Sequence, residues 1–213
     1  MSYTESAEAI LHEWVQSESL RKHCYAVAAS TRHFAGLLGG DPDLWNAVAL
    51  LHDMDFEKYP DMPAAGPETT AVSEALVGDA PLPAELPGHP FYGVAALRER
   101  GWSPEVRRAI LSHADYSGVS RETPLEKTLA AVDELSSFVV ACALVKPTKS
   151  VFDVDVAGVR KKMKDKAFAR AVSREEITHN AAALGMPLEE VIGHVIEALR
   201  ADAARLGVAG TSA

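Results

Sequence analysis

The chain has 213 residues, of which 47% are hydrophobic and 24% are charged, a composition typical of one soluble domain with a sizeable core. Its formal net charge of -9 argues against a general nucleic-acid-binding protein, because binding along a phosphate backbone requires a basic surface. The first residues lack a basic segment followed by an apolar run, and no stretch approaches about 18 uninterrupted apolar residues. We therefore expect a cytoplasmic protein that does not bind a membrane.

Helix start and stop signals recur along the chain, whereas the alternating pattern of a strand is scarce, so the sequence predicts an all-α fold. Gly39-Gly40 ends one predicted helix, and Asp41-Pro42 caps the start of the next. The proline-rich segment 55–88 is expected to be mostly loop, with a short helix around residues 70–77, and is a natural place for a substrate loop. The predicted helices span residues 6–16, 19–38, 42–53, 90–100, 103–113, 123–145, 155–165, 173–184 and 187–206.

A histidine and an aspartate stand side by side where one predicted helix ends. His52 and Asp53 lie about 100° apart around the helix axis, so both can approach one cation beside the helix end. The turn at Gly39-Gly40 makes the preceding helix an antiparallel neighbour and brings His23 toward His52, with a mismatch of about one helical turn. These residues predict the first half of a metal site.

A second helical hairpin offers another histidine pair. His89 precedes one helix and His113 closes the next, at roughly 17 and 15 Å from the turn between them. Asp133, inside the long apolar helix, supplies a second carboxylate. Imidazole and carboxylate ligands without thiolate favour iron, manganese, zinc, cobalt or nickel, and magnesium is possible where carboxylates and waters dominate. One or two divalent ions are thus the predicted cofactors.

The pattern His23…His52-Asp53…Asp133 resembles the signature of the HD-domain metal-dependent phosphohydrolase superfamily over most of residues 20 to 140. His89-Pro90…Gly93…Leu97 and Ala109-Ile110-Leu111-Ser112-His113 resemble the extra histidine segments of the branches with dinuclear sites, which include cyclic-dinucleotide phosphodiesterases. The Gly-Tyr-Pro loop that is diagnostic of the cyclic-dinucleotide branch is absent, and Met54-Asp55 follows the His-Asp pair instead. Cyclic dinucleotides are therefore not the expected substrate.

The resemblance implies an HD-domain-like helical bundle and a division of the ligands. His23, His52, Asp53 and Asp133 would hold the first metal, and Asp53 would bridge to a second metal held by His89 and His113. If the site is mononuclear, His89 and His113 would instead contact substrate. The metal core would span residues 20–145 and a C-terminal helical extension residues 146–208, within a single domain over residues 1–213.

The implied activity is that of a metal-dependent phosphohydrolase, which cleaves a phosphate ester of a nucleotide or of another small phosphorylated metabolite through metal-activated water. Asp53 is the predicted catalytic residue because it would position that water. Two alternatives share the ligand pattern, namely an HD-fold diiron oxygenase and a non-catalytic metal-binding regulatory protein. The sequence does not predict the oligomeric state.

Positive charge is concentrated in one stretch of this acidic chain. From Lys146 to Arg170, eight basic residues outnumber three acids, which gives +5 against -14 for the remainder. Such a run forms either a solvated helix face or a phosphate-binding wall. Lys146 and Lys149 follow the predicted helix that carries Asp133, so they are candidate substrate contacts. Lys58, five residues after Asp53, and Tyr116, just after His113, are two further candidates.

The other histidines and both cysteines are predicted to have structural roles. A single histidine in a helical protein usually pairs with a carbonyl or carboxylate, which is the role expected for His12, His33, His179 and His194. Cys24 and Cys142 lie far apart in apolar helical segments, so they are expected to be buried free thiols.

Overall fold

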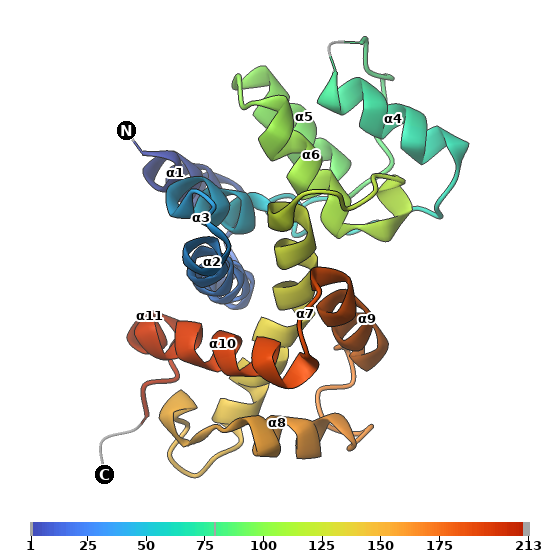
Figure 1. Cartoon of the computed structure of the whole chain (residues 1–213). Helices are drawn as coiled ribbons and strands as arrows, with labels where there is room; N and C mark the ends of the chain where they lie inside the picture. Colours follow the sequence, from blue (N-terminus) through green and yellow to red (C-terminus); the bar gives the residue numbers. More distant parts are fainter. Residues whose placement is uncertain (1, 79, 211–213) are drawn as a thin grey trace.

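The computed structural model describes residues 2–78 and 80–210, and this part of the chain folds almost entirely into helices (Figure 1). Its only β feature is a single antiparallel bridge between Ser150 and Ala209. The all-α prediction is confirmed. The elements are α1 (Tyr3–Trp14), α2 (Glu18–Leu38), α3 (Pro42–Leu51), α4 (Pro67–Val77), α5 (Phe91–Glu99), α6 (Pro104–His113), the 3₁₀ turn η1 (Asp115–Ser117), α7 (Pro124–Leu144), the 3₁₀ turn η2 (Val151–Asp153), α8 (Val156–Met163), α9 (Arg174–Leu184), α10 (Leu188–Ala201) and α11 (Ala203–Leu206).

Local capping chemistry sets the hairpin of α2 and α3. Gly39 ends α2 in the left-handed conformation with φ 72°, which costs glycine nothing. Asp41 then caps α3 by accepting hydrogen bonds from the backbone N–H groups of Asp43 and Leu44. The Asp43 carboxylate in turn accepts the N–H groups of Tyr3 and Thr4 at the start of α1, at 2.7 and 3.0 Å. These caps end α2, begin α3 and join the start of α3 to the start of α1.

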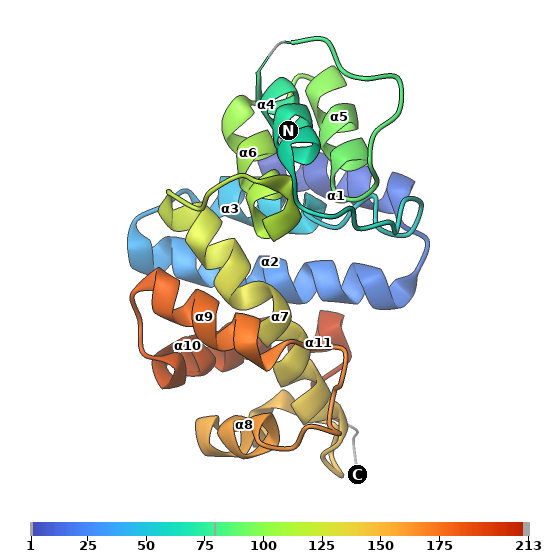
Figure 2. The same cartoon turned by 90° about the vertical axis from the view of Figure 1, so that its right-hand side faces the viewer.

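Helix α7 runs through the centre of the molecule. Figure 2 shows α2 and α7 crossing between the group α4–α6 above and the group α8–α11 below. Helix α7 buries residues on nearly all of its sides, including Leu129, Leu135 and Phe138. A helix that is buried all round must be positioned by its neighbours, so any side chain that it carries toward the interior is held at a fixed depth.

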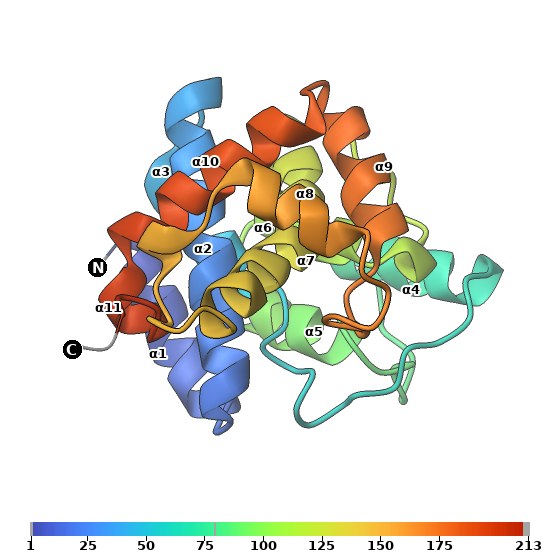
Figure 3. The same cartoon turned by 90° about the horizontal axis from the view of Figure 1, so that it is seen from below.

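The C-terminal helices pack on the same core as the N-terminal ones. Helices α8, α9 and α10 pack against α7, and α10 also packs against α2; Figure 3 shows this group from below. Val191, Val195 and Leu199 on α10 are fully buried and belong to the same hydrophobic cluster as the core residues of α2 and α7. Within the described residues, no helix has the length and apolar character that crossing a lipid bilayer requires.

Several boundaries differ from those predicted, and a specific contact or residue accompanies each difference. The first helix begins at Tyr3, because Ser2 and Glu5 form a capping box ahead of it. The loop segment contains a longer helix than expected, since Pro67 occupies its first turn. The predicted helix 187–206 divides at Asp202, whose carboxylate accepts a hydrogen bond from Arg32 of α2 at 2.8 Å.

The cap of α7 gives a stability prediction. Thr123 accepts the N–H of Glu126, and the Glu126 carboxylate accepts the N–H of Thr123 in return. Replacing Thr123 by Ala removes one side of this box and is expected to lower the free energy of unfolding by about 1 kcal/mol, or about 2–4 °C in Tm. Thr123→Ser keeps the hydroxyl and should melt like the wild type. Equal melting of Thr123→Ala and Thr123→Ser would contradict the capping role.

Candidate metal centre

Six side chains from separate parts of the chain point into one interior site. His23 comes from α2, His113 from the last residue of α6, and Asp133 from the middle of α7. His52 and Asp53 follow directly after α3, and His89 precedes α5. These are the six residues that the sequence predicted as metal ligands, and the structure brings all of them together.

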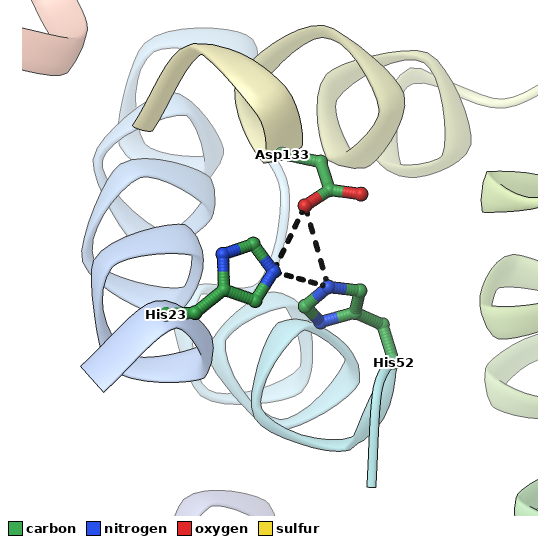
Figure 4. Close-up of side chains that lie close together, drawn as sticks. All are labelled: His23, His52 and Asp133. Carbon is green, nitrogen blue, oxygen red and sulfur yellow. Dashed lines mark hydrogen bonds and ion pairs between the residues drawn. The ribbon is translucent and has the colours of Figure 1, made fainter. Parts of the chain in front are cut away.

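The first group consists of His23, His52 and Asp133 (Figure 4). The two Nε2 atoms of His23 and His52 lie 3.1 Å apart. Oδ1 of Asp133 lies 3.1 Å from Nε2 of His23 and 3.4 Å from Nε2 of His52. The sequence placed these two histidines about one helical turn apart along the hairpin, yet their ring nitrogens meet. Three ligand atoms therefore form a nearly equilateral triangle.

The second group consists of Asp53, His89 and His113. Nε2 of His89 and Nε2 of His113 lie 3.1 Å apart. Oδ1 of Asp53 lies 3.3 Å from the first of these atoms and 3.6 Å from the second. This triangle has nearly the dimensions of the first.

Asp53 joins the two groups. Its other oxygen, Oδ2, lies 3.3 Å from Nε2 of His23 and 3.5 Å from Nε2 of His52. One carboxylate thus turns one oxygen toward each pair of histidines. Asp53 would therefore be able to serve as a ligand in both groups.

Backbone carbonyls fix the tautomers of two of the histidines. Nδ1 of His52 lies 2.7 Å from the carbonyl oxygen of Ala49, and Nδ1 of His113 lies 2.5 Å from that of Ile110. A carbonyl oxygen can only accept, so each Nδ1 carries the hydrogen. In the neutral rings, Nε2 then presents a lone pair to the site, which is the form that binds a metal.

The other two histidines are oriented by side chains that the sequence reasoning did not place in the site. Nδ1 of His89 lies 2.6 Å from Oδ1 of the fully buried Asp55, whose Oδ2 accepts the N–H of Gly93 at 2.7 Å. Nδ1 of His23 lies 2.8 Å from the hydroxyl oxygen of Ser137, one turn after Asp133 on α7. The position of Asp55, two residues after the His-Asp pair, could have indicated its role from the sequence. No local pattern indicated that Ser137 would contact His23.

The site concentrates opposite charges in the interior. Burial lowers the pKa of His23, but hydrogen bonds to Asp133 and Asp53 outweigh burial and raise it to about 10. For His89, burial is likewise outweighed by hydrogen bonds to Asp53 and Asp55, which raise its pKa to about 9. Burial raises the pKa of Asp53 and Asp133, yet the surrounding imidazoles hold both pKa values well below the ordinary range.

The donor set fits divalent metal ions. Ligands about 2.1 Å from an ion lie about 3.0 Å apart in an octahedral site and about 3.4 Å apart in a tetrahedral one. The distances of 3.1, 3.1 and 3.4 Å in the first group match this range. With Asp53 shared, one ion would have four protein ligands and the other three. That leaves positions open for water and substrate.

The predicted substrate contacts are distributed unevenly around this centre. Tyr116 is half-buried in η1, and burial together with the nearby charges of Asp53 and Asp55 raises the pKa of its hydroxyl. Lys58 is exposed, and its ammonium lies 4.3 Å from the centroid of the Trp14 ring.

The two lysines after α7 lie elsewhere. Lys146 follows Asp133 by thirteen residues, or about 20 Å along the helix axis. It lines a cavity of about 410 Å³ with Lys161 and Lys162. Lys149 stands in the turn after α7, with φ 51°. The structure does not bring either lysine together with the six ligands.

Comparison with known proteins identifies the part of the chain that carries this centre. The family model described as HD domain matches residues 20–137, a range that includes all six predicted ligands, Asp55 and Ser137. No match was found among curated proteins or among solved structures.

The Asp55 contact predicts unequal effects on two metal ions. Asp55→Asn keeps the size of the side chain but replaces the charged partner of His89. It should lower the affinity for the ion that His89 and His113 would hold about 10–100-fold, and leave the affinity for the other ion nearly unchanged. Calorimetric titration of the metal-free protein with Mn²⁺ or Zn²⁺ measures both affinities. Asp41→Asn is the matched control, since Asn caps α3 as well as Asp does. Equal weakening of both ions would contradict the assigned contact.

The raised imidazole pKa values predict opposite pH trends with and without metal. In the metal-free protein, the protonated His23 stabilises the fold below its unfolded pKa of about 6.5. That contribution is lost as the pH rises through the folded pKa of about 10. A metal ion binds only the neutral ring, so metal affinity should instead rise with pH up to about 10. Thermal melts in chelator and metal titrations at several pH values test both trends; metal affinity that is flat with pH would refute the second.

Proposed function

The chain belongs to the HD domain family, and we propose that it is a metal-dependent phosphohydrolase that cleaves a phosphate ester of a nucleotide or another small phosphorylated metabolite. The HD domain suggests a superfamily of metal-dependent hydrolases. The observation that carries the proposal is the carboxylate of Asp53, with one oxygen 3.3 Å from His23 and the other 3.3 Å from His89.

The donor set supports a pair of divalent ions as cofactors, with iron, manganese, zinc, cobalt, nickel and magnesium as candidates. When bound, the ions would supply Lewis-acid activation of a water molecule and neutralise the charge that develops on the phosphoryl oxygens. The protein's contribution is to hold the ligands at fixed depth and orientation. Asp53 is the residue we assign to catalysis, because it faces both halves of the site.

Two residues are proposed to contact the substrate. The hydroxyl of Tyr116 is protonated at neutral pH, as in any tyrosine, so it can donate a hydrogen bond to a substrate oxygen. Its raised pKa extends this role to more alkaline pH. Lys58 lies in the turn segment that follows Asp53 and carries a positive charge suited to a phosphate. Lys146 and Lys149 follow the C-terminal end of α7, whereas Asp133 lies in its middle, so we do not assign them this role.

The test is phosphate release from a panel of nucleotides, sugar phosphates and phosphodiesters, with the metal-free protein reloaded with each candidate ion in turn. Asp53→Ala should lower kcat/KM by about 10³-fold or more, since it removes the ligand common to both groups. Tyr116→Phe should lower kcat/KM about tenfold, the effect of one neutral hydrogen bond. Asp41→Asn should retain full activity.

The panel also separates the alternatives. Oxygen uptake by the iron-loaded protein, without phosphate release from any substrate, would replace the hydrolase proposal with the diiron oxygenase. Metal binding with neither activity would leave a regulatory metal-binding protein. Metal-dependent phosphate release that is lost in Asp53→Ala supports the hydrolase.

A further inference from the structure

A second cluster of metal-binding side chains lies outside the centre described above. His33 of α2 faces His194 and Glu197 of α10. Nε2 of His33 lies 3.2 Å from Nδ1 of His194, and 3.9 Å from Oε2 of Glu197. Only structural roles were predicted for His33 and His194 from the sequence. Their meeting could not be seen there, because 161 positions separate them.

We propose that His33, His194 and Glu197 bind a further divalent transition-metal ion of the Zn²⁺ class, separate from the metal centre. Two imidazole nitrogens and one carboxylate oxygen are a donor set that zinc accepts, with water in the fourth position. The site depends on neither the activity nor the ions proposed for the metal centre.

The spacing of the two histidines fits one zinc ion. Two nitrogens that bind a tetrahedral Zn²⁺ at about 2.0–2.1 Å lie about 3.3 Å apart, close to the observed 3.2 Å. The oxygen of Glu197 is about half an ångström farther from His33 than this geometry requires. Its side chain is 71% exposed, so a small rotation brings the carboxylate into place.

The surroundings hold both rings in position. Phe34 makes edge contacts with His33 and His194, with ring centroids 6.1 and 5.5 Å apart. Both histidine side chains are 24% exposed. Most of each ring is therefore packed against the protein, and an ion can still reach the nitrogens from solvent. His194 and Glu197 stand three residues apart on α10, a spacing that places both on the same helix face. Oε1 of Glu190 lies 3.9 Å from Nε2 of His194, on the side away from His33.

This cluster cannot share an ion with the metal centre. His33 follows His23 by ten residues on α2, or about 15 Å along the helix axis. An ion held by His33, His194 and Glu197 would instead link α2 to α10. Because α2 carries His23, the link would fasten the C-terminal helices to a helix of the metal centre and stabilise the folded state against unfolding.

The experiment measures zinc binding by the full-length, untagged, metal-free protein. The wild type is compared with the double variant His33→Ala/His194→Ala and with His179→Ala, which removes an exposed histidine from α9. The double variant should bind one zinc ion fewer per chain by calorimetry and elemental analysis, and His179→Ala should match the wild type. The phosphohydrolase assay should give the same kcat/KM for all three proteins, because none of these residues belongs to the metal centre.

Glu197→Gln is the second variant, chosen because an exposed side chain can be changed without disturbing the core. It should lower the zinc affinity of this site about tenfold or more while the other zinc ions bind as before. Equal zinc stoichiometry in the wild type and the double variant would overturn the proposal and leave an ordinary hydrogen bond between two histidines. Unchanged zinc affinity in Glu197→Gln would also overturn it, because the carboxylate would then not be a ligand.

Discussion

The carboxylate of Asp53 is held between two pairs of imidazoles in the interior, and this arrangement needs positive charge. Asp53 and Asp133 keep their negative charges because the surrounding rings depress their pKa values. The positive charge comes either from protons on His23 and His89 or from metal ions that displace those protons. Folding and metal binding are therefore coupled through the same few atoms.

The helical scaffold supports this buried cluster by giving the outer nitrogen of each of its four histidines a polar partner. Two carbonyl oxygens, one buried carboxylate and one hydroxyl each contact an Nδ1 atom, so that every Nε2 faces inward. Asp55 is itself held by the N–H of Gly93, where a Cβ atom would lie 3.0 Å from the carboxyl carbon of Asp55. The absence of a side chain at Gly93 thus belongs to the same support.

Three regions of the molecule gather side chains that could bind ligands. Three residues of the basic stretch, Lys146, Lys161 and Lys162, line a cavity beside the C-terminal end of α7. Tyr116, by contrast, lies in η1 just after α6, within range of the charges of Asp53 and Asp55. Lys58 follows Asp53 by five residues, and its ammonium lies over the ring of Trp14. The cluster of His33 and His194 lies in a third region, where α10 crosses α2. Each region has its own ligand chemistry, and the helices separate them.

The sequence alone determined the all-α class and the approximate positions of most helices, and it predicted the six side chains that the structure brings together. Caps, glycine stops and the His-Asp pair are local signals, which is why they could be read there. Thr123 and Glu126, for example, form a capping box within four residues and so predict the start of α7. Only the tertiary structure decided which side chains support the ligands and which distant ones meet. Ser137 contacts His23 across 114 positions, and His33 meets His194 across 161. Such pairings depend on how helices cross, and no local pattern of residues encodes that crossing.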